Sequence, residues 1–148
     1  MAVDAATAWD EVCDQANDRN WVIVNTDLEV VSTGNGGLEE MKAAFDDSEV
    51  QFAGFVVYGI DDRGSTVSKR TKTVFCVWIG SGVGALARGR ALRCKDEAAN
   101  LFNGHNLSID VDDTDDLTQK AIADRLLKAG GAHKPTAYDF GPEQVMEL

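Results

Sequence analysis

Residues 63–95, RGSTVSKRTKTVFCVWIGSGVGALARGRALRCK, decide how the rest of the chain is arranged. They hold eight of the 14 basic residues and no Asp or Glu, a net charge of +8. The remaining residues carry six basic and 25 acidic side chains, a net charge of −19. Opposed potentials steer encounter and fix orientation, so this segregation indicates an acidic partner rather than a merely solvated basic face. The eight residues are Arg63, Lys69, Arg70, Lys72, Arg88, Arg90, Arg93 and Lys95.

The composition is that of an ordinary soluble globular protein. A chain of 148 residues with 44% apolar and 26% charged residues fits one domain with a real core. No apolar run reaches the roughly 18–20 residues that cross a bilayer, and the first residues show no secretory signal. Cys13, Cys76 and Cys94 lack CxxC spacing, which favours reduced thiols in the cytoplasm. The net charge of −11 argues against a nucleic-acid partner.

Hydrophobic periodicity predicts an α/β fold. Alternating and β-branched runs predict strands, apolar residues at helical spacing predict helices, and helix-to-strand order after residue 85 implies a parallel crossover. We therefore expect one domain over 1–131, with a mixed sheet of about five strands flanked by four helices, and a loosely held tail at 132–148. The expected strands are 21–24, 28–33, 50–58, 71–79 and 107–109, and the helices are 4–17, 38–45, 85–102 and one that Asp113 or Thr114 caps and Gly130 and Gly131 end in a left-handed conformation.

The glycine-rich run from Gly80 to Ala85 follows a predicted strand, opens a predicted helix and fits the GxGxxA dinucleotide pattern. Asp110, at the end of the next strand, would suit the ribose. A nucleotide fold needs further βαβ units, but only one helix remains after Ile109 and the upstream strands look antiparallel. We therefore expect a turn without a ligand.

The spacing of the aspartates, histidines and nucleophilic residues supports neither a metal site nor a catalytic site. An EF-hand loop counted from Asp110 puts Asp115 where glycine is needed and Ala121 where the bidentate glutamate is needed. His105 and His133 belong to no HxxxH or HExxH pair, and no nucleophile, base and orienting acid can be assembled. We expect no enzyme activity, no cofactor and no metal.

The predicted helix at 85–102 carries residues that lower its stability. Arg88, Arg90 and Arg93 occupy its first half, where the macrodipole disfavours cations. Leu92 lies between two basic flanks, an arrangement suited to a protein groove lined by carboxylates. A second basic cluster, Lys69 to Lys72, begins the preceding strand and would lie at the opposite end of the sheet. A partner that touches both must be large or repeated, which fits a polymer.

The chain resembles the coactosins of the actin-depolymerising factor homology (ADF-H) superfamily. The resemblance runs from about residue 50 to 131 and is weaker before it. The segments that carry it are Phe52-Ala53-Gly54-Phe55-Val56, Ser68-Lys69-Arg70-Thr71-Lys72, Val77-Trp78-Ile79-Gly80, Arg88-Gly89-Arg90 and Leu127-Lys128-Ala129-Gly130-Gly131.

The resemblance implies a mixed sheet with four helices and binding to actin, mainly filamentous. It implies one surface on the long helix and a second at the strand mouth and the end of the last helix. Ala2, Val3 and Asp4 stand where cofilins carry a regulatory serine, so that control is not expected, and severing is not carried over. The expected actin-binding residues are Lys69, Arg70, Lys72, Arg88, Arg90, Lys95, Arg125 and Lys128.

These observations predict a monomeric, non-enzymatic protein of the cytoplasm and cytoskeleton. It would decorate actin filaments and modulate filament dynamics or the access of other regulators. The alternative is a small adaptor that uses the same basic surface to bind another acidic protein or phosphoinositides.

Overall fold

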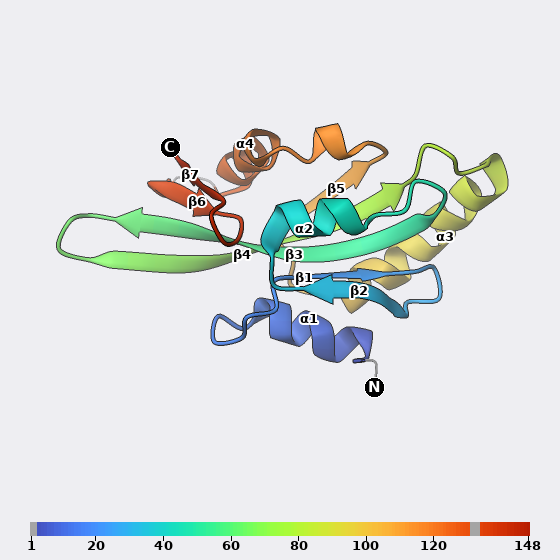
Figure 1. Cartoon of the computed structure of the whole chain (residues 1–148), viewed down its shortest axis with the longest axis horizontal. Helices are drawn as coiled ribbons and strands as arrows, with labels where there is room; N and C mark the ends of the chain where they lie inside the picture. Colours follow the sequence, from blue (N-terminus) through green and yellow to red (C-terminus); the bar gives the residue numbers. More distant parts are fainter. Residues whose placement is uncertain (1–2, 131–133) are drawn as a thin grey trace.

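The computed structural model describes residues 3–130 and 134–148, which form four α-helices, one 3₁₀ helix and seven strands (Figure 1). In chain order these are α1 (Ala5–Cys13), β1 (Trp21–Val24), β2 (Val30–Gly34), α2 (Gly37–Ala44), β3 (Val50–Asp62), β4 (Val67–Ile79), α3 (Ala85–Leu101), β5 (Leu107–Val111), η1 (Thr114–Asp116), α4 (Gln119–Ala129), β6 (Ala137–Asp139) and β7 (Val145–Glu147).

All seven strands belong to one mixed sheet. The main path has the order β2-β1-β3-β4-β5, and β6 joins it by pairing with β3 and β7. Every pairing is antiparallel except β4 with β5, which are joined through α3 as a parallel crossover. The predicted α/β class, mixed sheet and four helices are confirmed.

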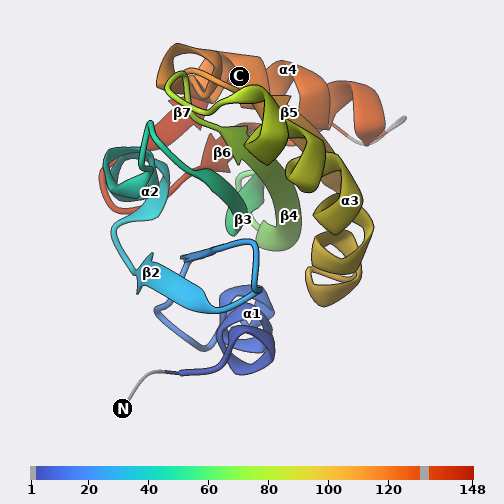
Figure 2. The same ribbon diagram turned by 90° about the vertical axis from the view of Figure 1, so that its right-hand side faces the viewer.

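Two layers of helices cover the sheet, α2 and α4 on one face and α1 and α3 on the other (Figure 2). Side chains alternate along β3 as the pleat requires: Phe55 and Val57 join the core under α2 and α4, whereas Phe52 and Val56 join the core under α1 and α3. Gly54 leaves room on the second face for rings from the two helices, because a Cβ there would overlap them.

The β3–β4 hairpin is longer than the sequence predicts. Each strand has 13 residues, and they pair without interruption from Val50↔Ile79 to Asp62↔Val67. The hairpin therefore projects well beyond the helical layers (Figure 1). The outer part of β4, Val67 to Arg70, is exposed and mostly polar, whereas Tyr58 to Asp61 on β3 are buried or half-buried. The hydrophobic periodicity of β4 therefore ends before its backbone pairing does. Asp61 and Asp62, which lie beyond the expected strand at 50–58, end β3.

The C-terminal segment is part of the sheet, in place of the loosely held tail expected at 132–148. From residue 134 onward it forms the β6–β7 hairpin, whose Tyr138 and Phe140 are 1% exposed in the core with α2 and α4. Thr136 extends the contact, since its backbone N–H donates to the Ile60 carbonyl at 2.7 Å. Three pairs in the half of β3 nearer the hairpin turn, from Tyr58↔Asp139 to Ile60↔Ala137, fix this edge.

Some helix ends also differ from expectation. Asp4 does cap α1, accepting from the Thr7 N–H at 2.8 Å, but α1 ends at Cys13 rather than near residue 17. Asp113 caps η1 instead of α4, which begins later with Thr118 as its cap. Gly130 follows α4 with a right-handed φ of −77°, so the predicted left-handed cap is wrong there, and Gly131 lies outside the described residues.

Candidate functional site

The first basic surface lies on α3 and consists of Arg88, Arg90, Arg93 and Lys95, here called the helix cluster. The helix begins after Gly84, which offers no side-chain cap, and its first turn carries no acidic residue. The three arginines are exposed and form no ion pair with any described residue. Arg88 lies in the first turn, at the positive end of the helix dipole, and donates from its Nε to the Val83 carbonyl at 3.3 Å, but no carboxylate of the described residues pairs with it.

Two leucines stand among these charges. Leu86 is 84% exposed and Leu92 is 74% exposed, more than any other large apolar side chain in the described residues. Spacing on the helix places Leu86 beside Arg90 and Arg93, and Leu92 beside Arg88. The sequence had indicated only Leu92; the position of Leu86 four residues before Arg90 was the available signal. An apolar centre with a charged rim is the usual anatomy of a protein-binding surface.

Lys95 differs from the other members of the helix cluster. It lies on the flank of α3 that faces β5 and is half-buried. Its Nζ lies 3.3 Å from each carboxylate oxygen of Asp110. The sequence grouped Lys95 with Arg88, but the structure gives it an acidic partner within the chain.

The second basic surface lies on β4 and consists of Lys69, Arg70 and Lys72, the hairpin cluster. The sequence treated the three as one group, but the pleat divides them. Arg70 and Lys72 continue the face of β4 that packs on α2 and α4, whereas Lys69 points to the opposite face. The Lys69 ammonium lies 3.9 Å from the centre of the Tyr58 ring, a cation–π contact.

Tyr58 and Lys69 share a polar cleft of about 430 Å³ between the loop after α1 and the β6–β7 hairpin. Burial raises the pKa of Tyr58, and the charges of Asp139 and Asp14 add to this effect. The phenol therefore stays protonated around neutral pH beside the Lys69 ammonium. Lys69 is held in this cleft, away from Arg70 and Lys72.

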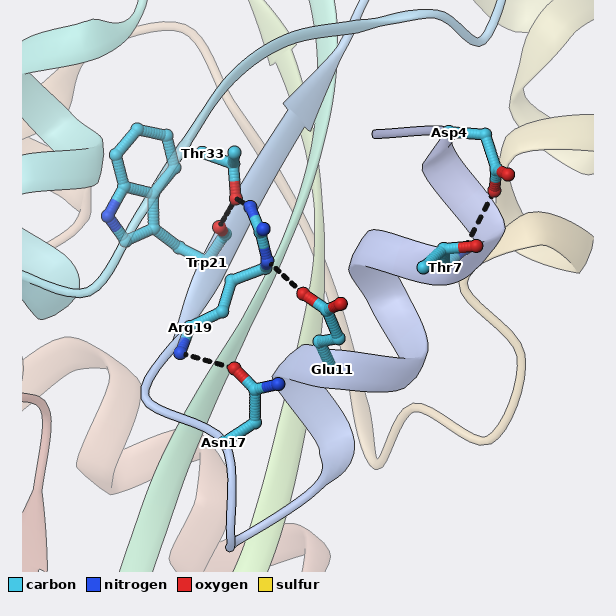
Figure 3. A network of polar contacts seen from close by, with 7 residues as sticks. All are labelled: Asp4, Thr7, Glu11, Asn17, Arg19, Trp21 and Thr33. Atoms are coloured by element: carbon cyan, nitrogen blue, oxygen red, sulfur yellow. Dashed lines mark hydrogen bonds and ion pairs between the residues drawn. The ribbon is translucent and has the colours of Figure 1, made fainter. Parts of the chain in front are cut away.

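A polar network anchors the loop that reaches this cleft (Figure 3). Arg19 Nε contacts Glu11 on α1 at 2.6 Å, and its Nη1 donates to the Thr33 hydroxyl on β2 at 2.7 Å. Gln15, in the same loop after α1, donates from its side-chain Nε2 to the Lys69 carbonyl at 3.1 Å and to the Thr71 hydroxyl at 2.9 Å. These bonds tie the backbone of the hairpin cluster to α1.

Arg125 and Lys128 are both exposed on α4. Lys128 lies in the last turn of α4. The C-terminal end of α4 is on the side of the molecule from which the β3–β4 hairpin projects (Figure 1). Arg125 instead lines a cavity of about 390 Å³ together with Asp110, Asp115 and Asp116. Arg125 thus has acidic neighbours within the chain, whereas Lys128 is exposed at the end of α4.

The two clusters lie at opposite ends of one rigid unit, as the sequence predicts. β4 carries the hairpin cluster near its start and ends at Ile79, after which the chain turns into α3 (Figure 1). Lys72 and Ile79 are seven residues apart, which is roughly 23 Å at the usual strand rise of about 3.3 Å per residue. One partner can therefore contact both clusters only over a long surface.

The glycine-rich turn between β4 and α3 serves packing. A Cβ at Gly80 would overlap the Asp47 carbonyl oxygen. The N–H of Gly80 donates to the Glu49 carbonyl at 3.1 Å, and that of Gly82 to the Asp47 carbonyl at 2.9 Å. The amides of this turn therefore bond to a neighbouring turn of the chain. The preceding strands β3 and β4 are antiparallel, whereas the strands of a dinucleotide-binding fold are parallel.

Other features of the described residues bear on site chemistry. No group of three or more His, Cys, Asp or Glu side chains within 3–130 and 134–148 is placed to hold a metal ion. In the same ranges, no helix has the length and apolar character that a membrane crossing requires.

Comparison with known proteins identifies the family. The family model for cofilin/tropomyosin-type actin-binding proteins matches residues 1–127. Coactosin of Entamoeba histolytica is 36% identical over 107 residues, which cover 71% of this chain and 69% of that protein. Coactosin of Dictyostelium discoideum is 27% identical over 136 residues, covering 88% and 90% of the two chains.

The fold agrees with these matches. The crystal structure of coactosin from Entamoeba histolytica superposes with a TM-score of 0.73 at 31% identity, covering 87% of this chain and 95% of that one. Members of this family are actin-binding proteins rather than enzymes, which confirms the predicted class. The chain therefore belongs to the cofilin/tropomyosin-type actin-binding protein family, within which it is similar to the coactosins.

Proposed function

We propose that this chain binds actin filaments through the helix cluster and the hairpin cluster together. The observation that carries the proposal is that the hairpin cluster lies on the outer part of β4, whereas the helix cluster lies on α3, which begins beyond the other end of that strand; Lys72 is seven residues, roughly 23 Å, from the end of β4 at Ile79. A filament offers a repeated acidic surface on which both ends find contacts, whereas a single small partner reaches one end.

The helix cluster supplies the apolar contact. Leu86 and Leu92 bury area on docking, and Arg88, Arg90 and Arg93 around them pair with carboxylates of actin. Arginine suits this role because its planar guanidinium binds carboxylates bidentately. The hairpin cluster contributes Lys72 and Arg70 on one face of β4, and Lys128 lies on the same side of the molecule.

We infer that the chain decorates filaments, and severing is not part of the proposal. The chain would occupy sites along the filament, modulate access of other actin regulators and so alter filament dynamics, and it would be found with the cytoskeleton. Much of the contact is exposed charge, so salt should weaken the binding.

Co-sedimentation with actin filaments at low and at physiological salt tests the proposal, with monomeric actin as the comparison. We expect pelleting with filaments that falls as salt rises. If the chain fails to pellet at both salts, the filament proposal is wrong; flotation with phosphoinositide vesicles would then support the adaptor alternative.

Two matched variants test the site. Lys72→Ala should weaken filament binding by roughly 1–3 kcal/mol, about five- to 150-fold, if the ammonium is desolvated against an actin carboxylate. Lys42→Ala removes one lysine from α2, outside both clusters, and should bind like the wild type. Equal pelleting of folded Lys72→Ala and Lys42→Ala would remove the hairpin cluster from the site.

A further inference from the structure

Lys95, at one edge of the helix cluster, contacts a strongly acidic stretch of the same chain. Five aspartates follow one another at the end of β5, across the turn and into η1, and they are here called the acidic segment. None of them belongs to the buried core. The acidic segment consists of Asp110, Asp112, Asp113, Asp115 and Asp116.

Within the acidic segment, the carboxylate of Asp110 lies against α3. The pairing Val77↔Asp110 sets its position on β5, and its neighbours Ile109 and Val111 point into the core under α2 and α4. By alternation the Asp110 side chain points to the face that α3 covers. There both carboxylate oxygens lie 3.3 Å from Lys95 Nζ.

The same segment also reaches a second cation of the expected actin-binding set. Arg125 on α4 lines the 390 Å³ cavity whose other charged residues are Asp110, Asp115 and Asp116. The arginines of the helix cluster, by contrast, form no ion pair within the described residues. The acidic segment thus lowers the positive potential at one edge of the basic surface only.

We propose that the acidic segment, acting through Asp110, competes with actin for Lys95 and limits how tightly the chain holds a filament. This inference rests on the proposed function, and it assigns Asp110 a role that opposes binding. An actin carboxylate that approaches Lys95 must displace Asp110 or share the ammonium with it.

The effect should be modest and sensitive to salt. Lys95 and Asp110 have side-chain exposures of 35% and 63%, so water weakens their attraction. Exposed pairs of this kind change an equilibrium by about two- to fivefold. The difference should shrink as salt screens exposed charges beyond about 8–10 Å.

Asp110→Asn tests the inference, with Glu39→Gln as its matched control. Glu39 pairs with Lys42 on α2 at 3.2 Å, so its substitution also removes one negative charge and one exposed ion pair, but on the opposite face of the sheet. In co-sedimentation at low salt, Asp110→Asn should bind filaments two- to fivefold more tightly than the wild type, while Glu39→Gln stays unchanged. A merely structural role for Asp110 would weaken binding instead.

A Lys95→Met background separates the local competition from a general charge effect. There, Asp110→Asn should change filament affinity no more than Glu39→Gln does. An equal gain with and without Lys95 would overturn the competition, as would weaker or unchanged binding of Asp110→Asn in the wild-type background. Pelleting of the wild-type chain is the baseline: its absence defeats the proposed function, whereas pelleting without a gain in Asp110→Asn defeats this inference alone.

Discussion

Phe140→Ala should destabilise the domain strongly, although residue 140 lies in the segment expected to be a loose tail. The Phe140 ring is 1% exposed and packs edge-on to Tyr138, with ring centroids 6.4 Å apart. Its backbone is fixed as well, because its carbonyl accepts from the Leu38 N–H at 3.0 Å. The substitution therefore opens a cavity between β6 and α2 that its surroundings cannot easily close.

The size of the effect follows from burial. Truncation of a fully buried phenylalanine to alanine costs about 3–5 kcal/mol, from lost transfer free energy and the residual cavity. Domains of this kind have about 5–15 kcal/mol of unfolding free energy in total. For about 150 residues each kcal/mol corresponds to roughly 2–4 °C, so Tm should fall by roughly 6–20 °C.

Urea unfolding monitored by tryptophan fluorescence measures this directly. Val145→Ala is the matched control, because Val145 lies in the same hairpin but is 52% exposed, and it should change the unfolding free energy by less than about 1 kcal/mol. If Phe140→Ala and Val145→Ala destabilise the chain by the same small amount, the C-terminal segment is a tail and the reasoning is refuted.

Three further predictions concern the Gly80 turn, the apolar centre of the helix cluster and a shielded thiol. Gly80→Ala should lower the unfolding free energy by about 1–3 kcal/mol, because its Cβ would overlap the Asp47 carbonyl; an unchanged urea midpoint would contradict the packing role of the turn. Leu92→Ala should weaken filament pelleting by at least about fivefold with Tm unchanged, as a leucine at the centre of an interface would; unchanged pelleting would exclude Leu92 from the contact. Cys13 should alkylate at pH 8 at least about tenfold more slowly than a free thiol, because burial, aided by Asp10, raises its pKa to about 11 and leaves little thiolate; peptide mass spectrometry would contradict this if folded and urea-unfolded chains reacted equally fast.

The sequence predicts the fold correctly where the buried residues recur with the spacing of a strand or of a helix. The run from Trp21 to Val24 is buried throughout and forms β1, and Ala91 and Ala98 line the inner face of α3 as their spacing indicates. The outer hairpin could not be predicted this way, since residues 61–70 lie outside the core and are held by backbone pairing. The C-terminal hairpin was missed because its strands have only three residues each, too few for a period.

The candidate site could be predicted as a charge pattern but not as a set of contacts. The separation of the two clusters followed from strand and helix order alone. The contact of Lys69 with Tyr58 depends on the register in which β3 pairs with β4. The ion pair of Lys95 with Asp110 depends on the crossover that brings β5 beside α3. The sequence interpreted Asp110 only in terms of ribose or calcium, because nothing local connects it to a lysine 15 residues earlier.

A cryo-EM reconstruction of actin filaments decorated with this chain would test the central claim most directly. The account predicts that the start of α3, with Leu86, Leu92 and the arginines, and the hairpin cluster around Lys72 both face actin. Density that shows only one of the two clusters in contact, or the chain attached through α2, would contradict it.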